Sequence, residues 1–133
     1  MNNKPKTITV IKLDVKNEKP GEAITIPDEL ESYRTHIGCD AIDIVERLIG
    51  EKKYCIVCDD VGALDEKRIV SSFNYVSQQP MFFGNLIITG LPDDEGNLTT
   101  LTNQDVKNIF SSIQKTIVFD EKIRIYNVLM CDY

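Results

Sequence analysis

An apolar period of two residues is the feature that most constrains the fold of this chain of 133 residues. It is clearest over Thr7–Val15, where Ile11 and Leu13 fall on one face and Ile8 and Val10 on the other. Because successive side chains of a strand point to opposite faces, this pattern predicts a β-strand. Similar short patterns predict five further strands, at Glu22–Ile26, Asp40–Ile49, Lys52–Cys58, Met81–Leu91 (interrupted at Gly84-Asn85) and Lys122–Met130.

Two segments carry the period of an amphipathic helix instead. The first has an apolar stripe from Leu30 to Ile37 and is followed by Gly38, which suits the left-handed conformation that ends helices. The second begins at residues 102–105, Thr-Asn-Gln-Asp, which resemble a capping box, and its stripe continues to position 113. A third, shorter helix is expected at Leu64–Phe73.

These elements predict an α+β fold with a mixed or mainly antiparallel sheet of five to six strands and two main helices packed on one face. The chain has the length of a single domain, which we assign to residues 1–133. Short polar turns join Thr7–Val15 to Glu22–Ile26 and Asp40–Ile49 to Lys52–Cys58, so both pairs are expected as hairpins. The C-terminal strand is expected at a sheet edge or exchanged with a second copy, which would give a homodimer.

The net charge of −6 is unevenly distributed along the chain. Residues 1–20 hold five lysines and two acids, residues 21–60 hold ten acids and four bases, and residues 61–133 hold nine acids and six bases. A protein held on a phosphate backbone needs clustered Lys and Arg, so we expect no direct contact with nucleic acid. One version of a binding function is that the acidic region 21–60 imitates DNA and blocks a DNA-binding enzyme.

The sequence carries no pattern that predicts membrane insertion or export. The longest run without charge, residues 69–92, contains serines, asparagines and glutamines that do not suit hydrocarbon. The beginning of the chain has Lys12 and Asp14 where a signal peptide would be apolar. We therefore expect a cytoplasmic protein whose four cysteines are free thiols.

His36, Cys39, Cys55 and Cys58 have the spacing H-x2-C-x15-C-x2-C, which falls within the range of zinc sites. A small-molecule or zinc-binding protein that uses these four residues is the alternative function. Against it, Cys55 and Cys58 lie in a predicted strand, where positions three apart point to opposite faces. Buried thiols explain the same cysteines, and a mid-strand pair lacks the helix N-terminus that activates redox cysteines.

Enzymatic chemistry has little support in the residues. His36 is the one histidine and lies among predicted core positions, and no glycine-rich phosphate loop occurs. The acidic pairs at 59–60 and 93–95 do not match the spacing of a calcium loop. We expect no catalytic residue, no resident metal and no cofactor.

Residues 71–83 form an uncharged stretch that is rich in aromatic and amide side chains. Such side chains are typical of protein interfaces, although a loop that packs its own aromatics under a sheet has the same composition. We take the predicted binding residues from this stretch: Phe73, Asn74, Tyr75, Gln78 and Gln79.

The order of segments resembles a small family of unknown function from Gram-positive bacteria, their phages and their conjugative elements. The likeness covers about residues 7–115 and leaves 116–133 as a C-terminal strand extension. It is carried by residues 8–11, 20–21, 29–33, 37–45, 84–91 and 101–106. The resemblance implies no activity and no catalytic residue, but it does imply an accessory protein of mobile DNA. We expect a non-enzymatic binding protein that acts through contact with another protein.

Overall fold

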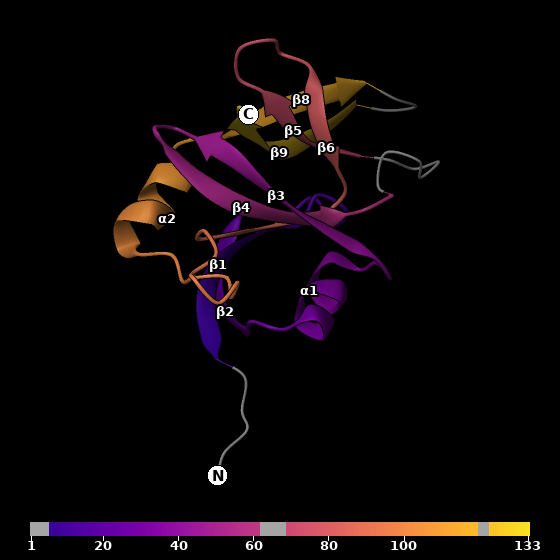
Figure 1. The fold of residues 1–133 in the computed structure, drawn as a ribbon. Coiled ribbons are helices and arrows are strands. Elements are labelled where there is room, and N and C mark those ends of the chain that lie inside the picture. Colours follow the sequence, from indigo (N-terminus) through magenta and orange to yellow (C-terminus); the bar gives the residue numbers. More distant parts are fainter. Residues whose placement is uncertain (1–5, 62–68, 120–122) are drawn as a thin grey trace.

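The structure, a computed structural model, describes residues 6–61, 69–119 and 123–133. Over these residues the chain forms nine strands and two helices, arranged in two sheets (Figure 1). The elements are β1 (Thr7–Leu13), β2 (Glu22–Pro27), α1 (Leu30–Ile37), β3 (Ile42–Ile49), β4 (Lys52–Asp59), β5 (Val70–Asn74), β6 (Pro80–Phe83), β7 (Leu86–Thr89), α2 (Asn103–Phe110), β8 (Ile113–Phe119) and β9 (Ile123–Cys131).

The large sheet has the order β2-β1-β7-β4-β3, and the small sheet has the order β6-β5-β9-β8. Every pair in both sheets is antiparallel except β5 with β9, which run parallel. The expectation of an α+β fold with mainly antiparallel pairing is confirmed, but the single sheet of five to six strands is wrong. The chain changes sheets at Gly84-Asn85, where the pattern predicted a break, and Gly84 allows the turn because its φ is +82°.

The two predicted hairpins are present. β1 pairs with β2 from Thr7 opposite Pro27 to Lys12 opposite Glu22, and β3 pairs with β4 along the full length of both strands. The end of α1 and the start of α2 also have the expected chemistry. Gly38 follows α1 in the left-handed conformation, and Thr102 and Asp105 form the capping box of α2.

The larger core lies between the two sheets. Strands β1, β4 and β7 contribute one of their faces, β9 contributes from the small sheet, and α2 contributes Ile109. The central members have less than 2% of their surface exposed: Ile11, Leu13, Ile56, Leu86, Ile88, Ile109, Val128 and Leu129. Burial of this apolar surface is the main source of stability for the fold.

A second core covers the opposite face of the large sheet. Here α1 packs Tyr33 and Ile37 onto Val10, Val57 and Ile87. The two helices therefore lie on opposite faces of the large sheet, and the expectation that both pack on one face is wrong. Strand alternation explains the result, because β1, β4 and β7 are apolar on both faces and each face needs a cover.

Three segments differ from their predicted form. Leu64–Arg68, the first part of the third predicted helix, lies outside the described residues, and the rest is wrong because Val70–Asn74 forms β5. The stripe of α2 ends at Phe110, and position 113 begins β8, a strand that the pattern did not predict. The C-terminal strand is present as β9 but lies between β5 and β8, not at an edge.

Each helix of the described chain has eight residues, and neither has the length or apolar character to cross a membrane.

Candidate functional site

The candidate site is a groove of about 480 Å³ where the two sheets meet at the end of β9. We call it the Tyr75 groove. Four segments that are distant in the sequence form its walls: the turn between β3 and β4, the loop between β5 and β6, the end of α2 with the start of β8, and the end of β9. Its lining residues are Leu48, Gly50, Glu51, Tyr75, Val76, Ser111, Ser112, Gln114, Met130, Cys131 and Asp132.

The loop between β5 and β6 is held in place by Asn74. This side chain is buried, its Oδ1 accepts hydrogen bonds of 2.8 Å from the backbone N–H groups of Val76 and Ser77, and its Nδ2 donates to Asp132 Oδ1 at 2.9 Å. The backbone N–H of Tyr75 also donates to the carbonyl of Cys131 at 2.7 Å. Asn74 is therefore a positioning residue that ties the loop to the end of β9.

The fixed loop presents two apolar side chains to solvent. Tyr75 is 67% exposed and Val76 is 72% exposed, although their backbone is anchored on both sides. Large apolar groups that a folded loop keeps in water are a feature of contact surfaces. A rigid presentation also lowers the conformational entropy that a binding partner must overcome.

Of the five predicted binding residues, the structure places one in the groove. Tyr75 lines the groove, and Asn74 fixes the loop that carries Tyr75. Phe73 is partly buried against the larger core, so the alternative interpretation of a self-packing aromatic holds for this residue. Gln78 and Gln79 are exposed but do not line the groove, and Gln78 instead donates from its Nε2 to the carbonyl of Tyr75 at 3.0 Å.

Two carboxylates give the groove a negative character. Glu51 lies at the turn between β3 and β4, and Asp132 lies at the end of β9. Hydrogen bonds to Asp132 from Asn74 and from the backbone of Tyr133 lower the pKa of this carboxyl. Asp132 therefore stays ionised at neutral pH and can attract a cation.

The end of β9 is fastened to the large sheet beside the groove. Leu48 and Asp132 exchange two backbone hydrogen bonds, of 2.7 and 2.8 Å. The neighbouring Arg47 guanidinium lies 5.4 Å from the centroid of the Phe82 ring and 5.0 Å from that of Tyr133. Cation–π contacts on both sides thus hold the last residue of the chain against β3.

A second polar network holds α2 behind the groove. Asp105 Oδ1 accepts hydrogen bonds of 2.8 Å from Lys52 Nζ and from Tyr54 Oη, and Asp105 Oδ2 accepts one of 2.9 Å from the backbone of Thr102. Although burial alone would raise the pKa of Asp105, these hydrogen bonds hold it well below its usual range. The network is satisfied within the protein, so its role is structural.

The proposed zinc ligands do not come together. Cys55 belongs to the core under α1, whereas Cys58 belongs to the core between the sheets. Burial raises the pKa of Cys55 to about 11 and that of Cys58 to about 12, so both stay protonated thiols. Among the residues that the structure describes, no group of three or more His, Cys, Asp or Glu side chains is placed to hold a metal ion. The four residues of the zinc alternative are therefore not placed together as ligands of one ion.

His36 has no arrangement for catalysis around it. Its Nδ1 lies 3.4 Å from Lys12 Nζ, and partial burial together with the Lys12 charge lowers the pKa of this imidazole. A neutral imidazole that accepts a hydrogen bond from lysine is a satisfied surface group. A paired nucleophile would require a different neighbour.

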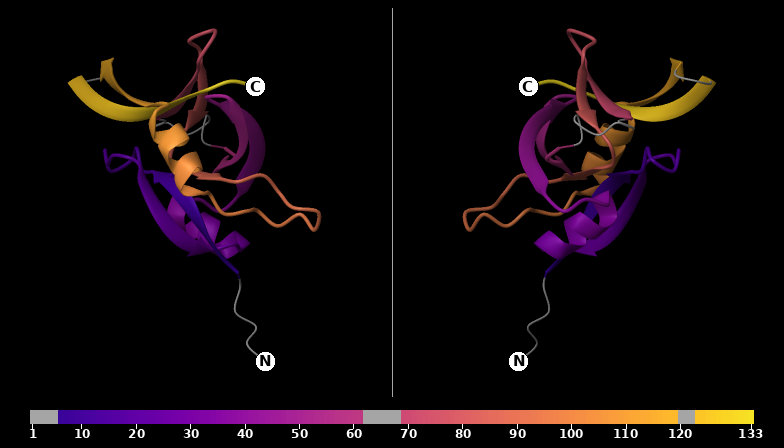
Figure 2. Two further views of the ribbon diagram at one scale, coloured as in Figure 1. Left: turned by 90° about the vertical axis from the view of Figure 1, so that its left-hand side faces the viewer. Right: turned by 90° about the vertical axis from the view of Figure 1, so that its right-hand side faces the viewer.

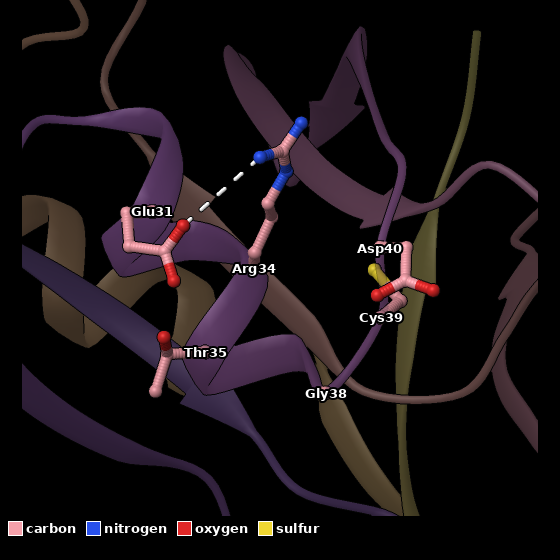
Figure 3. Close-up of a pocket in the computed structure, with 6 residues that line it drawn as sticks. All are labelled: Glu31, Arg34, Thr35, Gly38, Cys39 and Asp40. Carbon is pink, nitrogen blue, oxygen red and sulfur yellow. Dashed lines mark ion pairs between the residues drawn. The ribbon is translucent and has the colours of Figure 1, made fainter.

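A shallow polar cavity of about 530 Å³ lies at the end of α1 (Figure 3). Glu31 reaches toward Arg34, with 4.0 Å between Oε2 and Nη1, while Cys39 and Asp40 line the opposite side. Burial and the nearby Asp59 charge raise the pKa of the Cys39 thiol, which keeps it protonated. The cavity therefore offers neither an activated nucleophile nor an uncompensated cation.

Within the acidic region 21–60, the β3–β4 hairpin carries both signs of charge. Asp43 and Asp59 lie at its open end, and toward its turn two acids lie among three bases: Glu46, Arg47, Glu51, Lys52 and Lys53. Acidic and basic side chains are thus mixed along this hairpin. This arrangement argues against the imitation of DNA by this hairpin, because a duplex presents phosphates at regular intervals along its length.

The residues that sequence reasoning missed are Leu48, Glu51, Met130 and Asp132. None belongs to a local motif, and the four come from β3, the following turn and the end of β9. The pairing of β5 with β9 brings the end of β9 beside Tyr75, and the pairing of Leu48 with Asp132 adds the end of β3. No signal within a single segment of the sequence marks them.

Comparison with known families shows to which family the chain belongs. The chain matches the family model described as Domain of unknown function (DUF3846) over residues 8–114. This chain belongs to that family. The expected resemblance to a family of unknown function is thereby confirmed. A search of curated proteins and a search of solved structures each gave no match.

The DUF3846 match and the groove overlap only in part. The matched residues include the large sheet except Thr7, the β5–β6 loop and α2, and they end at Gln114 in β8. Met130, Cys131 and Asp132 lie beyond the match. The Tyr75 groove is therefore built jointly by the DUF3846 region and by the C-terminal hairpin β8–β9.

Proposed function

We propose that this member of the DUF3846 family is a non-enzymatic accessory protein of a mobile genetic element, which acts in the cytoplasm by binding another protein. The observation that carries the proposal is the Tyr75 groove, where an anchored loop holds Tyr75 and Val76 in solvent beside an apolar hollow. The resemblance noted in the sequence supports the mobile-element context.

The chemistry of the groove indicates the kind of partner. Leu48, Met130 and Val76 provide apolar walls, so the partner inserts an apolar side chain. Glu51 and Asp132 at the same groove favour a lysine or arginine next to that anchor, because opposite charges across an interface set its register and orientation. The partner is thus a protein segment in which an apolar residue stands beside a basic one.

The test is a selection from a random peptide library displayed on phage, with the purified chain as target. Enriched peptides are expected to combine an apolar residue with a nearby Lys or Arg. Val76→Ser and Tyr75→Ala are each expected to weaken their binding by at least about tenfold, because burial of one such side chain is worth that much. Titration calorimetry on synthetic peptides measures the change.

The matched control is Val61→Ser. Val61 is 54% exposed and lies outside the groove, so its loss is expected to leave peptide binding unchanged. Glu51→Gln is expected to weaken basic peptides more than neutral ones. Equal binding by wild type, Val76→Ser and Tyr75→Ala would show that the groove is not the binding site.

A further inference from the structure

The outer edge of β3, at one end of the large sheet, is closed by its own side chains. In an edge strand, the backbone N–H and C=O groups of every second residue point away from the neighbouring strand. In β3 these are the groups of Ile44, Glu46 and Leu48. The N–H of Ile44 is bonded to Asp43 Oδ1 at 2.9 Å, and the carbonyl of Glu46 accepts from Arg47 Nη1 at 2.7 Å. Leu48 is paired with Asp132. A foreign strand finds few free groups here.

The outer edge of β8, at one end of the small sheet, differs from this. Among the described residues, the strand pairing of β8 is with β9 alone, and no side chain caps its outer groups. The β8–β9 hairpin also projects from the body of the molecule (Figure 2). Ile117, Ile123 and Ile125 are 58%, 68% and 57% exposed on this hairpin.

The three isoleucines lie on one face of the hairpin. Ile117 is directly opposite Ile125 in the register, and Ile123 is two positions from Ile125. Residues of equal parity share a face of a sheet, so the three form one apolar patch that reaches the open edge. An open edge next to an apolar patch is a template for the addition of a further strand.

We propose that β8 pairs antiparallel with β8 of a second copy of this chain, which joins the two four-stranded sheets into one. A two-fold axis at Ile117 places this residue beside Ile117 of the second copy. The row Ile125–Ile117 then continues into the same row of the other copy, across four neighbouring strands. Each copy thus contributes the same apolar patch to the contact, as a two-fold symmetric interface requires.

Charge disfavours an axis at Lys115, and the isoleucine row favours the axis at Ile117. With the axis at Ile117, Lys115 lies opposite position 119 of the second copy, and the two Lys115 residues are four positions apart. At the rise of a strand this offset is about 13 Å, which exceeds the screening length of about 8 Å at physiological salt. An axis at Lys115 would instead set two ammonium groups face to face, at a cost in free energy.

The size of the contact indicates a weak dimer. A single seven-residue strand edge with three isoleucines provides less than the ~800 Å² per partner of a standard stable interface. The dimer is therefore expected to dissociate on dilution. The Tyr75 groove reaches β8 only at Gln114, whereas the proposed axis is at Ile117, so substitutions at Ile117 test the dimer apart from the proposed function.

The first test is sedimentation velocity of the full chain from ~10 µM to ~1 mM, a range that spans weak dissociation constants. The wild type is expected to shift from monomer to dimer, and Ile117→Lys is expected to weaken the dimer by at least about tenfold. The matched control is Ile44→Lys, which places the same charge on an isoleucine that is 45% exposed at the closed edge of β3. The control is expected to dimerise as the wild type does.

A monomer at every concentration would overturn the proposal and would leave β8 open to a strand of another protein. A dimer that Ile117→Lys leaves intact would overturn it as well. Circular dichroism of each variant checks that the fold is retained.

The second test fixes the register through a disulfide. In a Cys39→Ser background, which removes the one cysteine of the chain that is not buried, Ile117→Cys is expected to form a cross-linked dimer on mild oxidation. Lys115→Cys is expected to cross-link much less, because about 13 Å separates the two positions and a disulfide needs Cβ atoms about 4 Å apart. More efficient cross-linking at position 115 than at 117 would exclude the proposed axis.

Discussion

The two sheets of this protein differ in how completely they are covered. The central strands of the large sheet, β1, β7 and β4, are buried on both faces, by α1 on one side and by the small sheet with α2 on the other. The small sheet is buried at the end of β9 near Val128 and Leu129, but its β8–β9 hairpin leaves isoleucines in solvent. The same chain thus combines one sheet with a covered centre and another with an exposed hairpin.

The two sheets therefore have different roles: the large sheet provides most of the stability of the fold, and the small sheet provides the exposed surfaces for contact with a partner. The large sheet has the apolar alternation, the contact with the capped helix α2 and the occupied edge of β3 that favour a stable unit. The small sheet contributes the Tyr75 loop, part of the groove and the open edge of β8. The features on which both proposals depend are therefore placed on the less covered sheet, where exposed groups are available to a partner.

The largest expected effect follows from the difference in burial. Ile88 lies in β7 at the centre of the large sheet with 0% exposure, whereas Ile117 in β8 is 58% exposed. Ile88→Ala is expected to lower the free energy of unfolding by about 2–5 kcal/mol, because it leaves a cavity in a packed core. Ile117→Ala is expected to change it by less than about 0.5 kcal/mol at concentrations where the chain is monomeric.

Urea unfolding followed by circular dichroism measures both variants. Since both replace isoleucine by alanine within a strand, the substitution itself is matched and the position is the variable. Similar losses in the two variants would mean that the small sheet contributes as much as the large one, and the comparison would fail.

The second effect concerns the anchor of α2 on the large sheet. Asp105→Asn removes a carboxylate that accepts hydrogen bonds from Lys52, Tyr54 and Thr102. Hydrogen bonds to a charged group contribute about 1.5–3 kcal/mol, so a loss of that order in the free energy of unfolding is expected at pH 7.

The pH dependence of this effect has a definite sign. The pKa of Asp105 is lower in the folded state than in the unfolded state, so its stabilisation is complete above the ordinary aspartate pKa of about 3.9. It is lost as pH falls below that value toward the folded pKa. The gap between wild type and Asp105→Asn is therefore expected to narrow from pH 7 to pH 3. A gap that stays constant would assign the loss to packing and not to the ionised carboxylate.

The local parts of the fold followed from the sequence. The hairpins β1–β2 and β3–β4, the end of α1 at Gly38 and the capping box of α2 depend on residues within a few positions of one another. The division into two sheets did not follow, because it depends on the parallel pairing of β5 with β9, which are separated by about fifty residues. The hydrophobic periodicity of a strand indicates which of its faces is buried, but it does not indicate which distant strand pairs with it.

Of the residues that line the groove, the sequence predicted only Tyr75. Tyr75 was found because aromatic and amide residues gather around it, and that pattern also included Phe73, which packs inward. Asp132 and Leu48 were missed because their role depends on the backbone pairing between the end of β9 and the edge of β3. The cysteines show the opposite case, since strand alternation alone predicted that Cys55 and Cys58 point to different faces, and they do.

The smallest expected effect tests what keeps the edge of β3 closed. Asp43→Ala removes the side chain that occupies the N–H of Ile44, and because Asp43 is exposed, the free energy of unfolding is expected to change by less than about 0.5 kcal/mol. Combined with Ile117→Lys, which closes the route through β8, the substitution is expected to restore a slight concentration-dependent association through β3 in sedimentation velocity. The gain stays small because Arg47 and Asp132 still occupy the neighbouring groups of this edge. If the double variant sediments as a monomer at every concentration, Asp43 does not protect this edge, and the contrast between β3 and β8 would rest on the isoleucine patch alone.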